Sequence, residues 1–300
     1  MNRTVAIVVA AFVLAASMLG CCTLPRIPDI NINVPELVVG EVQEEQEAVP
    51  LSGIETADVE ILFGAGVLQV EPGSADELLS GRFAYNVEKW KPEITLEDNR
   101  LRIRQGGDQN AWGVPSGRVG DIRNEWDLAL TPAIPLAVDV RTGAGEGTLD
   151  LGGLRLTALG ISLGAGDFEV RFDEPNQAQL DRFTLDAGAS SLRVTGIGNA
   201  APQYTKVQGG AGDITLDFTG AWPESSEADI TAGFGSLTLQ LPAGVGVEVE
   251  IRGAITPVDA SGFEKRGNTY VNDAFGEAAT ELRIRITMGV GDIRLIEVSD

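Results

Sequence analysis

Apolar and polar residues alternate in short runs along most of the chain after Leu51, and glycines introduce many of these runs. Such alternation predicts β-strands with one apolar face. The side chains expected to face inward in two of the runs are Phe168, Val170, Phe172, Ile214, Leu216 and Phe218. No helical periodicity of useful length occurs, so the fold is expected to be all-β.

The glycine-rich starts of these runs repeat along the chain. Seven related segments span 64–70, 143–149, 164–170, 188–194, 210–216, 233–239 and 289–295. The middle five begin at Gly143, Gly164, Gly188, Gly210 and Gly233, in steps of 21, 24, 22 and 23 residues. A near-constant period of this size predicts a solenoid with stacked coils of about 22 residues, each built from alternating strands. The glycines expected at its corners are Gly64, Gly66, Gly164, Gly166, Gly210, Gly212, Gly233, Gly235, Gly289 and Gly291.

One such start, "QGGAGDITLDFTG" (208–220), could also be a phosphate-binding loop or a calcium repeat. A phosphate loop requires a following helix, whereas "DITLDF" alternates as a strand does. Calcium repeats have a nine-residue period, and this chain repeats at more than twice that spacing. The interpretation that remains is a coil corner, where Asp213 satisfies local backbone amides.

The N-terminus predicts export and lipidation. An apolar run from Val5 to Ala16 follows Arg3, and it is too short to span a bilayer, so we expect a signal peptide over residues 1–20. Met18-Leu19-Gly20-Cys21 resembles a lipobox, in which the cysteine is lipid-modified, although Cys22 is an alternative acceptor. The chain would then be held on the outer face of the bacterial cell membrane, or on an outer membrane if one is present.

Four segments are expected in all. The signal peptide (1–20) is followed by a lipid-anchored acidic tether with several prolines (21–53), a less regular β module (54–131) and the β-solenoid domain (132–300). Residues 105–121 have no strand pattern and are expected to form a surface loop.

Composition narrows the function. The chain has no histidine and only the two N-terminal cysteines, which excludes histidine-based catalytic triads, thiol nucleophiles and cysteine-based zinc sites. Its net charge of −22 argues against nucleic acid as a partner. Neither a metal nor a cofactor is expected.

Two features could bind a ligand. Alternation in "NRLRIRQ" (99–105) places Arg100, Arg102 and Arg104 on one face, where they could grip phosphate or carboxylate. Alternatively they pair with nearby acids such as Glu93, Glu97 and Asp98. Trp112 lies in the polar loop and could stack on a ligand, whereas Trp126 alternates with Leu128 and is expected in the core.

A family resemblance rests on particular segments. "GAG", "LLSGRF", "WKPEI" and "LRIRQ" occur within 62–105 in the order found in the N-terminal module of toast-rack proteins. "LPAGVGVEVEIRGAI" (241–255) and "RIRITMGVGDIRL" (283–295) are similar to the C-terminal domain of cell-wall-active-antibiotic-response proteins and their adhesin-like toast-rack relatives. The resemblance implies a single-stranded β-solenoid on the bacterial cell envelope, an association with envelope-stress signalling in some relatives, and no catalytic residues.

The sequence therefore predicts a non-catalytic envelope module that binds an envelope protein or a surface polymer. The alternatives are an adhesin or glycan-binding protein and, because β-solenoids can host enzymes that use carboxylates alone, a polysaccharide lyase or hydrolase.

Overall fold

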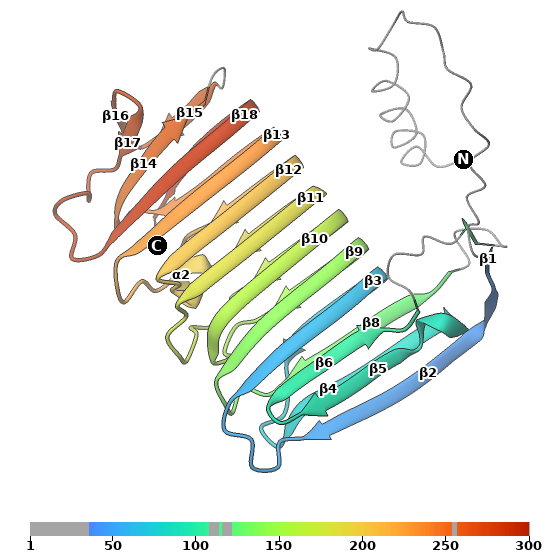
Figure 1. Cartoon of the computed structure of the whole chain (residues 1–300). Helices are drawn as coiled ribbons and strands as arrows, with labels where there is room; N and C mark the ends of the chain where they lie inside the picture. The colour runs from blue at the N-terminus through green and yellow to red at the C-terminus, as the bar shows by residue number, and fades with distance from the viewer. Residues whose placement is uncertain (1–35, 108–113, 116–121, 254–256, 300) are drawn as a thin grey trace, which may run out of the picture. The chain divides into compact units, whose positions relative to one another are not determined.

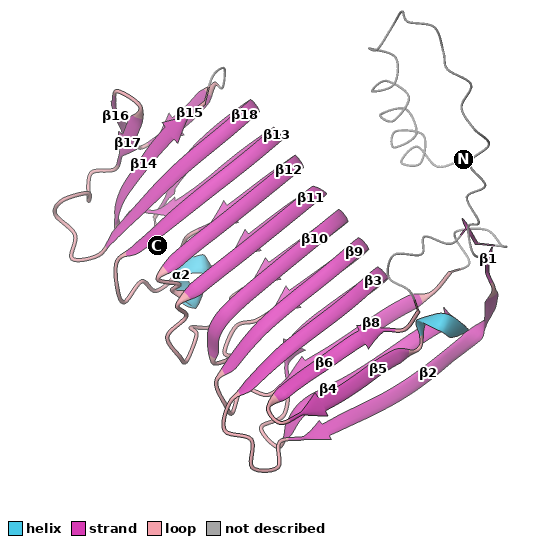
Figure 2. Ribbon diagram, viewed as in Figure 1, coloured by secondary structure: helices cyan, strands magenta, loops and turns pink. Residues whose placement is uncertain are grey.

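The computed structural model describes residues 36–107, 114–115, 122–253 and 257–299. Strands make up nearly all of its regular structure (Figure 2), and the helices in these ranges are η1 (Glu88–Trp90) and α2 (Ile197–Ala200). No helix of the described ranges is long and apolar enough to cross a membrane. The predicted all-β fold is confirmed.

Long parallel strands, one for each coil, follow one another across the sheet (Figure 1). They are β3 (Ala57–Pro72), β9 (Leu136–Asp150), β10 (Leu156–Arg171), β11 (Arg182–Thr195), β12 (Tyr204–Asp217), β13 (Ser226–Pro242) and β18 (Glu281–Val298). Each strand carries its glycine-rich corner near its middle, and we call the parts before and after the corner its first and second arms. One bent strand and its return loop make one coil, which confirms the predicted single-stranded β-solenoid.

The apolar core lies on the inward side of both arms. Alternation puts Leu159 and Ile161 of the first arm of β10 in the same core as Val170 of its second arm. All six side chains that the sequence places inward are buried: Phe168, Val170, Phe172, Ile214, Leu216 and Phe218. Trp126 is fully buried as well, and it makes edge-to-face contacts with Phe63 and Phe83 at centroid distances of 5.0 and 5.3 Å.

At the corners, the backbones of adjacent coils are in direct contact. A Cβ on Gly166 would lie 1.8 Å from the carbonyl oxygen of Gly145, the equivalent residue of the preceding coil. The same clash, between 1.8 and 2.6 Å, recurs at most of the other corners: Gly143, Gly145, Gly164, Gly188, Gly210, Gly212, Gly233, Gly235, Gly289 and Gly291. Glycine is thus required by the contact between coils as well as by the bend itself.

The corner of β3 has no preceding coil, and two side-chain amides take its place. Gly64 N donates to Oε1 of Gln105 at 2.9 Å, and Nδ2 of Asn124 donates to the carbonyl oxygen of Ala65 at 2.7 Å. The two amides also bond each other, with Asn124 Nδ2 donating to Gln105 Oε1 at 2.9 Å. Gln105 and Asn124 are both buried, so these bonds satisfy backbone groups that a further coil would otherwise pair.

Shorter strands complete both ends of the sheet. Those at the N-terminal end are β2 (Val39–Pro50), β4 (Glu77–Val87), β5 (Pro92–Glu97), β6 (Arg100–Gln105) and β8 (Asn124–Leu130). Those at the C-terminal end are β14 (Gly246–Arg252), β15 (Val258–Ser261), β16 (Glu264–Arg266) and β17 (Thr269–Val271). A separate parallel pair joins β1 (Glu36–Leu37) to β7 (Val114–Pro115), and most of the surface loop predicted for 105–121 lies outside the described residues.

The tether predicted for 21–53 is wrong from Val39 to Pro50. This segment is β2, which pairs antiparallel with β4 over most of its length. The backbone of β2 pairs with β4 despite the acidic composition, because most of its glutamates face solvent and Glu45 is bonded to Tyr85 and Lys91. The sheet also runs without a break past the boundary expected at 131/132, since the first arm of β3 pairs in register with that of β9.

Candidate functional site

The outward-facing side chains of the first arms form rows across the sheet, because the coils stack in register. The first row is Asp58, Ala137, Ala158, Arg182, Tyr204 and Glu227. The second row is Glu60, Asp139, Gly160, Thr184, Lys206 and Asp229. The third row, nearest the corners, is Leu62, Arg141, Ser162, Asp186, Gln208 and Thr231. Ligands that lie across several coils would meet these rows first.

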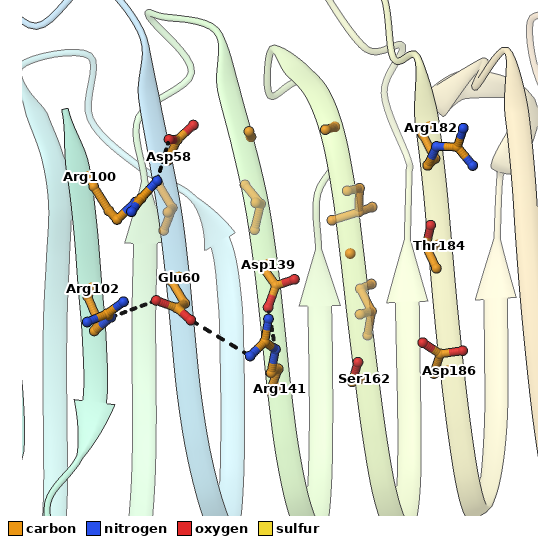
Figure 3. Close-up of a pocket in the computed structure, with 17 residues that line it drawn as sticks. Asp58, Glu60, Arg100, Arg102, Asp139, Arg141, Ser162, Arg182, Thr184 and Asp186 are labelled. Carbon is orange, nitrogen blue, oxygen red and sulfur yellow. Dashed lines mark hydrogen bonds and ion pairs between the residues drawn. The ribbon is translucent and has the colours of Figure 1, made fainter.

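Arginines and carboxylates pair across the strands at the N-terminal end of the rows (Figure 3). Arg102 Nε lies 2.6 Å from Glu60 Oε2, and Arg141 lies 2.8 Å from Asp139 and 3.9 Å from Glu60. Arg100 lies 3.5 Å from Asp58. Each charge is held by a partner on its own or an adjacent strand, which fixes the side chains before any ligand arrives.

A second charged network occupies the rows over β11 to β14. The Tyr204 hydroxyl donates to Asp229 Oδ2 at 2.6 Å, and Arg285 donates to Asp229 Oδ1 at 2.6 Å. The hydrogen bond to Asp229, followed by burial, raises the pKa of Tyr204, so the hydroxyl remains a donor through the neutral range. The Arg182 guanidinium lies over the Tyr204 ring, 5.0 Å from the ring centroid.

Between the two networks the outer face is hollow. The outward residues of β10 are Ala158, Gly160 and Ser162, and Ala137 of β9 lies beside them. Their small side chains leave a cavity of about 600 Å³, which we call the trough. A Cβ on Gly160 would lie 2.9 Å from Asp139 Oδ2, so glycine here leaves room for that carboxylate.

The trough is lined by charged and hydroxyl-bearing side chains on an open floor. Asp58, Glu60, Asp139, Arg100, Arg102 and Arg141 line its N-terminal side, and Arg182, Thr184 and Asp186 its other side. A second hollow, which shares Arg141, Ser162 and Asp186 with it, continues toward the corners. This arrangement offers hydrogen-bond donors and acceptors above a floor of small side chains.

The structure brings together only part of the predicted anion-binding face. Arg100 and Arg102 line the trough, whereas Arg104 pairs with Glu93, as the alternative interpretation of that strand foresaw. Asp58 and Glu60, the partners of the other two, come from β3, and this pairing could not be predicted because it depends on the register of β6 with β3. Cys21 and Trp112 lie outside the described residues.

Metal binding has no support in the described part of the chain. It contains no group of three or more histidine, cysteine, aspartate or glutamate side chains that could hold an ion. The carboxylates of the trough instead alternate with guanidinium groups across neighbouring strands.

Comparison with known families identifies the chain. The model for the N-terminal domain of toast_rack (DUF2154) matches residues 38–195, which is more than half of the sequence. The chain belongs to the toast-rack family. The match includes β2, the whole N-terminal end of the sheet and the trough. It ends before 241–255 and 283–295, so the resemblance of those segments to the antibiotic-response proteins stays a prediction.

Solved structures similar to this toast-rack protein are candidate adhesins and a candidate lipid-binding protein. The structure of a candidate cell adhesion protein from Clostridium sporogenes is 25% identical, with a TM-score of 0.47, and the match covers 86% of this chain and 100% of that one. A candidate adhesin from Bacteroides fragilis is 12% identical, with a TM-score of 0.36 and coverage of 85% and 97%. A candidate lipid-binding protein from Parabacteroides distasonis is 11% identical, with a TM-score of 0.35 and coverage of 87% and 100%. No curated protein matches the sequence.

Proposed function

We propose that this toast-rack protein is a non-catalytic binding module of the bacterial cell envelope, anchored through Cys21, and that the trough is its ligand-binding site. The observation that carries the proposal is the gap in the rows of side chains over β10. Every neighbouring coil carries at least one long or charged side chain in these rows, whereas β10 carries only Ala158, Gly160 and Ser162.

Rigidity supports binding at this place. The floor belongs to the middle of a sheet that is paired on both sides, and the N-terminal wall is held by ion pairs within β9 and between β6 and β3. A ligand therefore loses little affinity to the ordering of protein side chains, because they are already ordered.

The hydroxyls of the trough favour binding over nucleophilic catalysis. Neither Ser162 nor Thr184 forms a hydrogen bond with a basic side chain of the described ranges, and the sequence has no histidine to activate a hydroxyl. Activation by a neighbouring base is what a serine or threonine nucleophile requires.

Filling the trough tests the proposal. Ala158→Gln places a longer polar side chain on the floor and should lower binding to isolated cell envelopes about tenfold or more, a loss of about 1.4 kcal/mol. Co-sedimentation of the purified protein with envelopes measures this directly. Thr287→Gln is the matched control, because Thr287 is exposed on the outer face of β18, away from the trough. Equal binding by Ala158→Gln and the wild type would remove the trough as the site.

The identity of the partner separates two roles for such a module. Crosslinking in native envelopes, followed by identification of the attached molecules, distinguishes them. Capture of a membrane kinase supports a role in envelope-stress signalling, whereas capture of a glycan or a host surface molecule supports adhesion.

A further inference from the structure

Four arginines line the trough, and one differs from the others. Arg100, Arg102 and Arg141 each lie within 4 Å of a carboxylate, at distances of 3.5, 2.6 and 2.8 Å. Arg182 forms no ion pair with any residue that the structure describes. Its positive charge is therefore the one in the trough that no carboxylate neutralises directly.

Arg182 is nevertheless held in place. Its guanidinium lies over the Tyr204 ring, and the Tyr204 hydroxyl is fixed in turn by Asp229. Stacking occupies a face of the guanidinium and leaves its N–H groups, which point outward in the plane, able to donate. Figure 3 shows Arg182 on the side of the trough opposite the paired arginines.

The rows beyond Arg182 carry charges of both signs: Glu227 lies in its own row, and Asp229, which is bonded to Tyr204 and Arg285, lies in the next. Lys206 of β12 lies one row further along and forms no ion pair within the described ranges. Asp186, which is also without an ion-pair partner there, is on the same strand as Arg182 but four residues away, about 13 Å at the Cα atoms. An anionic group would thus meet Arg182 first, while hydroxyl groups of the same ligand could reach Asp186.

We infer that Arg182 anchors an anionic group, a carboxylate or a phosphate, of the ligand that binds in the trough. The inference rests on the proposed function. A planar guanidinium donates two parallel hydrogen bonds to either group, and Ala158 and Gly160 leave the space for it beside Arg182. The chain as a whole has a net charge of −22 and repels anions, so the interaction with Arg182 has to be short-ranged.

The test measures the affinity of the full chain for three short oligomers of equal length. One is built of glycerol phosphate, one of galacturonic acid and one of neutral glucose. Titration calorimetry near 0.15 M ionic strength is suitable, since the Debye length is then about 8 Å and the overall charge is screened. We expect one of the two anionic oligomers to bind more tightly than the neutral one, and which one it is identifies the source of the anion.

Variants assign the effect to Arg182. Arg182→Gln should weaken binding of the anionic oligomer about tenfold or more, and Arg182→Lys should weaken it less, because the charge remains without the paired geometry. Arg193→Gln is the matched control, since Arg193 is exposed on the second arm of the same strand and outside the trough.

Two results would overturn the inference: equal affinity for neutral and anionic oligomers, or unchanged affinity in Arg182→Gln. If Ala158→Gln still abolishes envelope binding in that case, the trough remains the site and only the anion assignment fails. If neither variant alters binding, the proposed function fails as well.

Discussion

At Gly166 the backbone bends with a φ of +138°, and the carbonyl oxygen of Gly145 occupies the place where a Cβ would be. Both features exclude a side chain, for different reasons. The positive φ strains an L-residue wherever it occurs, whereas the contact with Gly145 exists only because coils stack. A corner glycine therefore serves two requirements, the bend of its own strand and the contact with the neighbouring coil.

Two substitutions separate these requirements. Gly166→Ala should lower the free energy of unfolding by about 3 kcal/mol or more, because strain and clash add. Gly267→Ala, at a φ of +68° with nothing within 4 Å of the added Cβ, should cost only about 1–2 kcal/mol. Urea unfolding measures both. Similar costs at the two positions would show that coil contact adds nothing to the requirement.

At Ser190 the repeat pattern does not predict the backbone conformation. It occupies the position of the second corner glycine in β11, but its φ is not positive, and the pairing of β11 with β12 skips Ser190 and Ser191. Its hydroxyl is buried without a hydrogen-bond partner in the described structure. The sequence pattern predicted this corner at the correct place, but it did not predict the different backbone conformation at Ser190.

At the scale of elements, β2 is the clearest departure from the sequence-based prediction. Its glutamates and its terminal Pro50 resemble those of a linker, and only tertiary contacts reveal a strand. Glu45 accepts hydrogen bonds from Lys91 at 2.7 Å and from the Tyr85 hydroxyl at 2.9 Å. The bond from Lys91 holds the pKa of Glu45 below its usual range. Such contacts join residues about 40 positions apart, beyond the reach of pattern analysis.

The docking of β2 should depend on alkaline pH through Tyr85. Burial, and then the hydrogen bond to Glu45, raise the pKa of Tyr85 to about 12. A raised pKa in the folded state stabilises the fold below the ordinary tyrosine pKa of about 10, and this contribution is lost as pH rises toward 12. Between pH 10 and pH 12, the free energy of unfolding of Tyr85→Phe should fall less than that of the wild type. The difference should be about 2–3 kcal/mol over the whole window.

Urea unfolding between pH 9 and pH 12 measures this dependence. Tyr270→Phe is the control, since it removes a tyrosine hydroxyl from β17, at the other end of the sheet. A pH dependence in Tyr85→Phe as steep as that of the wild type would contradict the assignment.

At the scale of the molecule, one sheet connects β2 to β16 through all the coils. The change in pattern near residue 131 suggested two domains, but β3 is itself the first coil, and β6 and β8 pair with its two arms. The period of the repeat was enough to predict the solenoid, because alternation and glycine spacing are local properties.

The trough could not be predicted in the same way. It requires Ala158 to lie beside Ala137 and Arg182, and that register is set by return loops of different lengths. Alternation along one strand therefore predicted an anion-binding row from Arg100 to Arg104. The unpaired guanidinium is instead that of Arg182, which lies in a row that crosses several strands.

The proposed lipid anchor at Cys21 is tested on the full chain. Cys21→Ala should shift the chain from the detergent phase to the aqueous phase in Triton X-114 partitioning, because the acyl chains supply its membrane affinity. Cys22→Ala is the matched control and should remain in the detergent phase. Unchanged partitioning of Cys21→Ala would contradict the lipobox interpretation.

The stacking of corner on corner also limits how such a chain can evolve in length. Removing a few residues from within a bent strand would misalign its corner with both neighbours, whereas duplicating a complete coil would repeat every contact and widen the sheet by about 4.8 Å. We therefore expect natural relatives to grow or shrink by whole coils, with the trough retained when the duplication lies beyond β12.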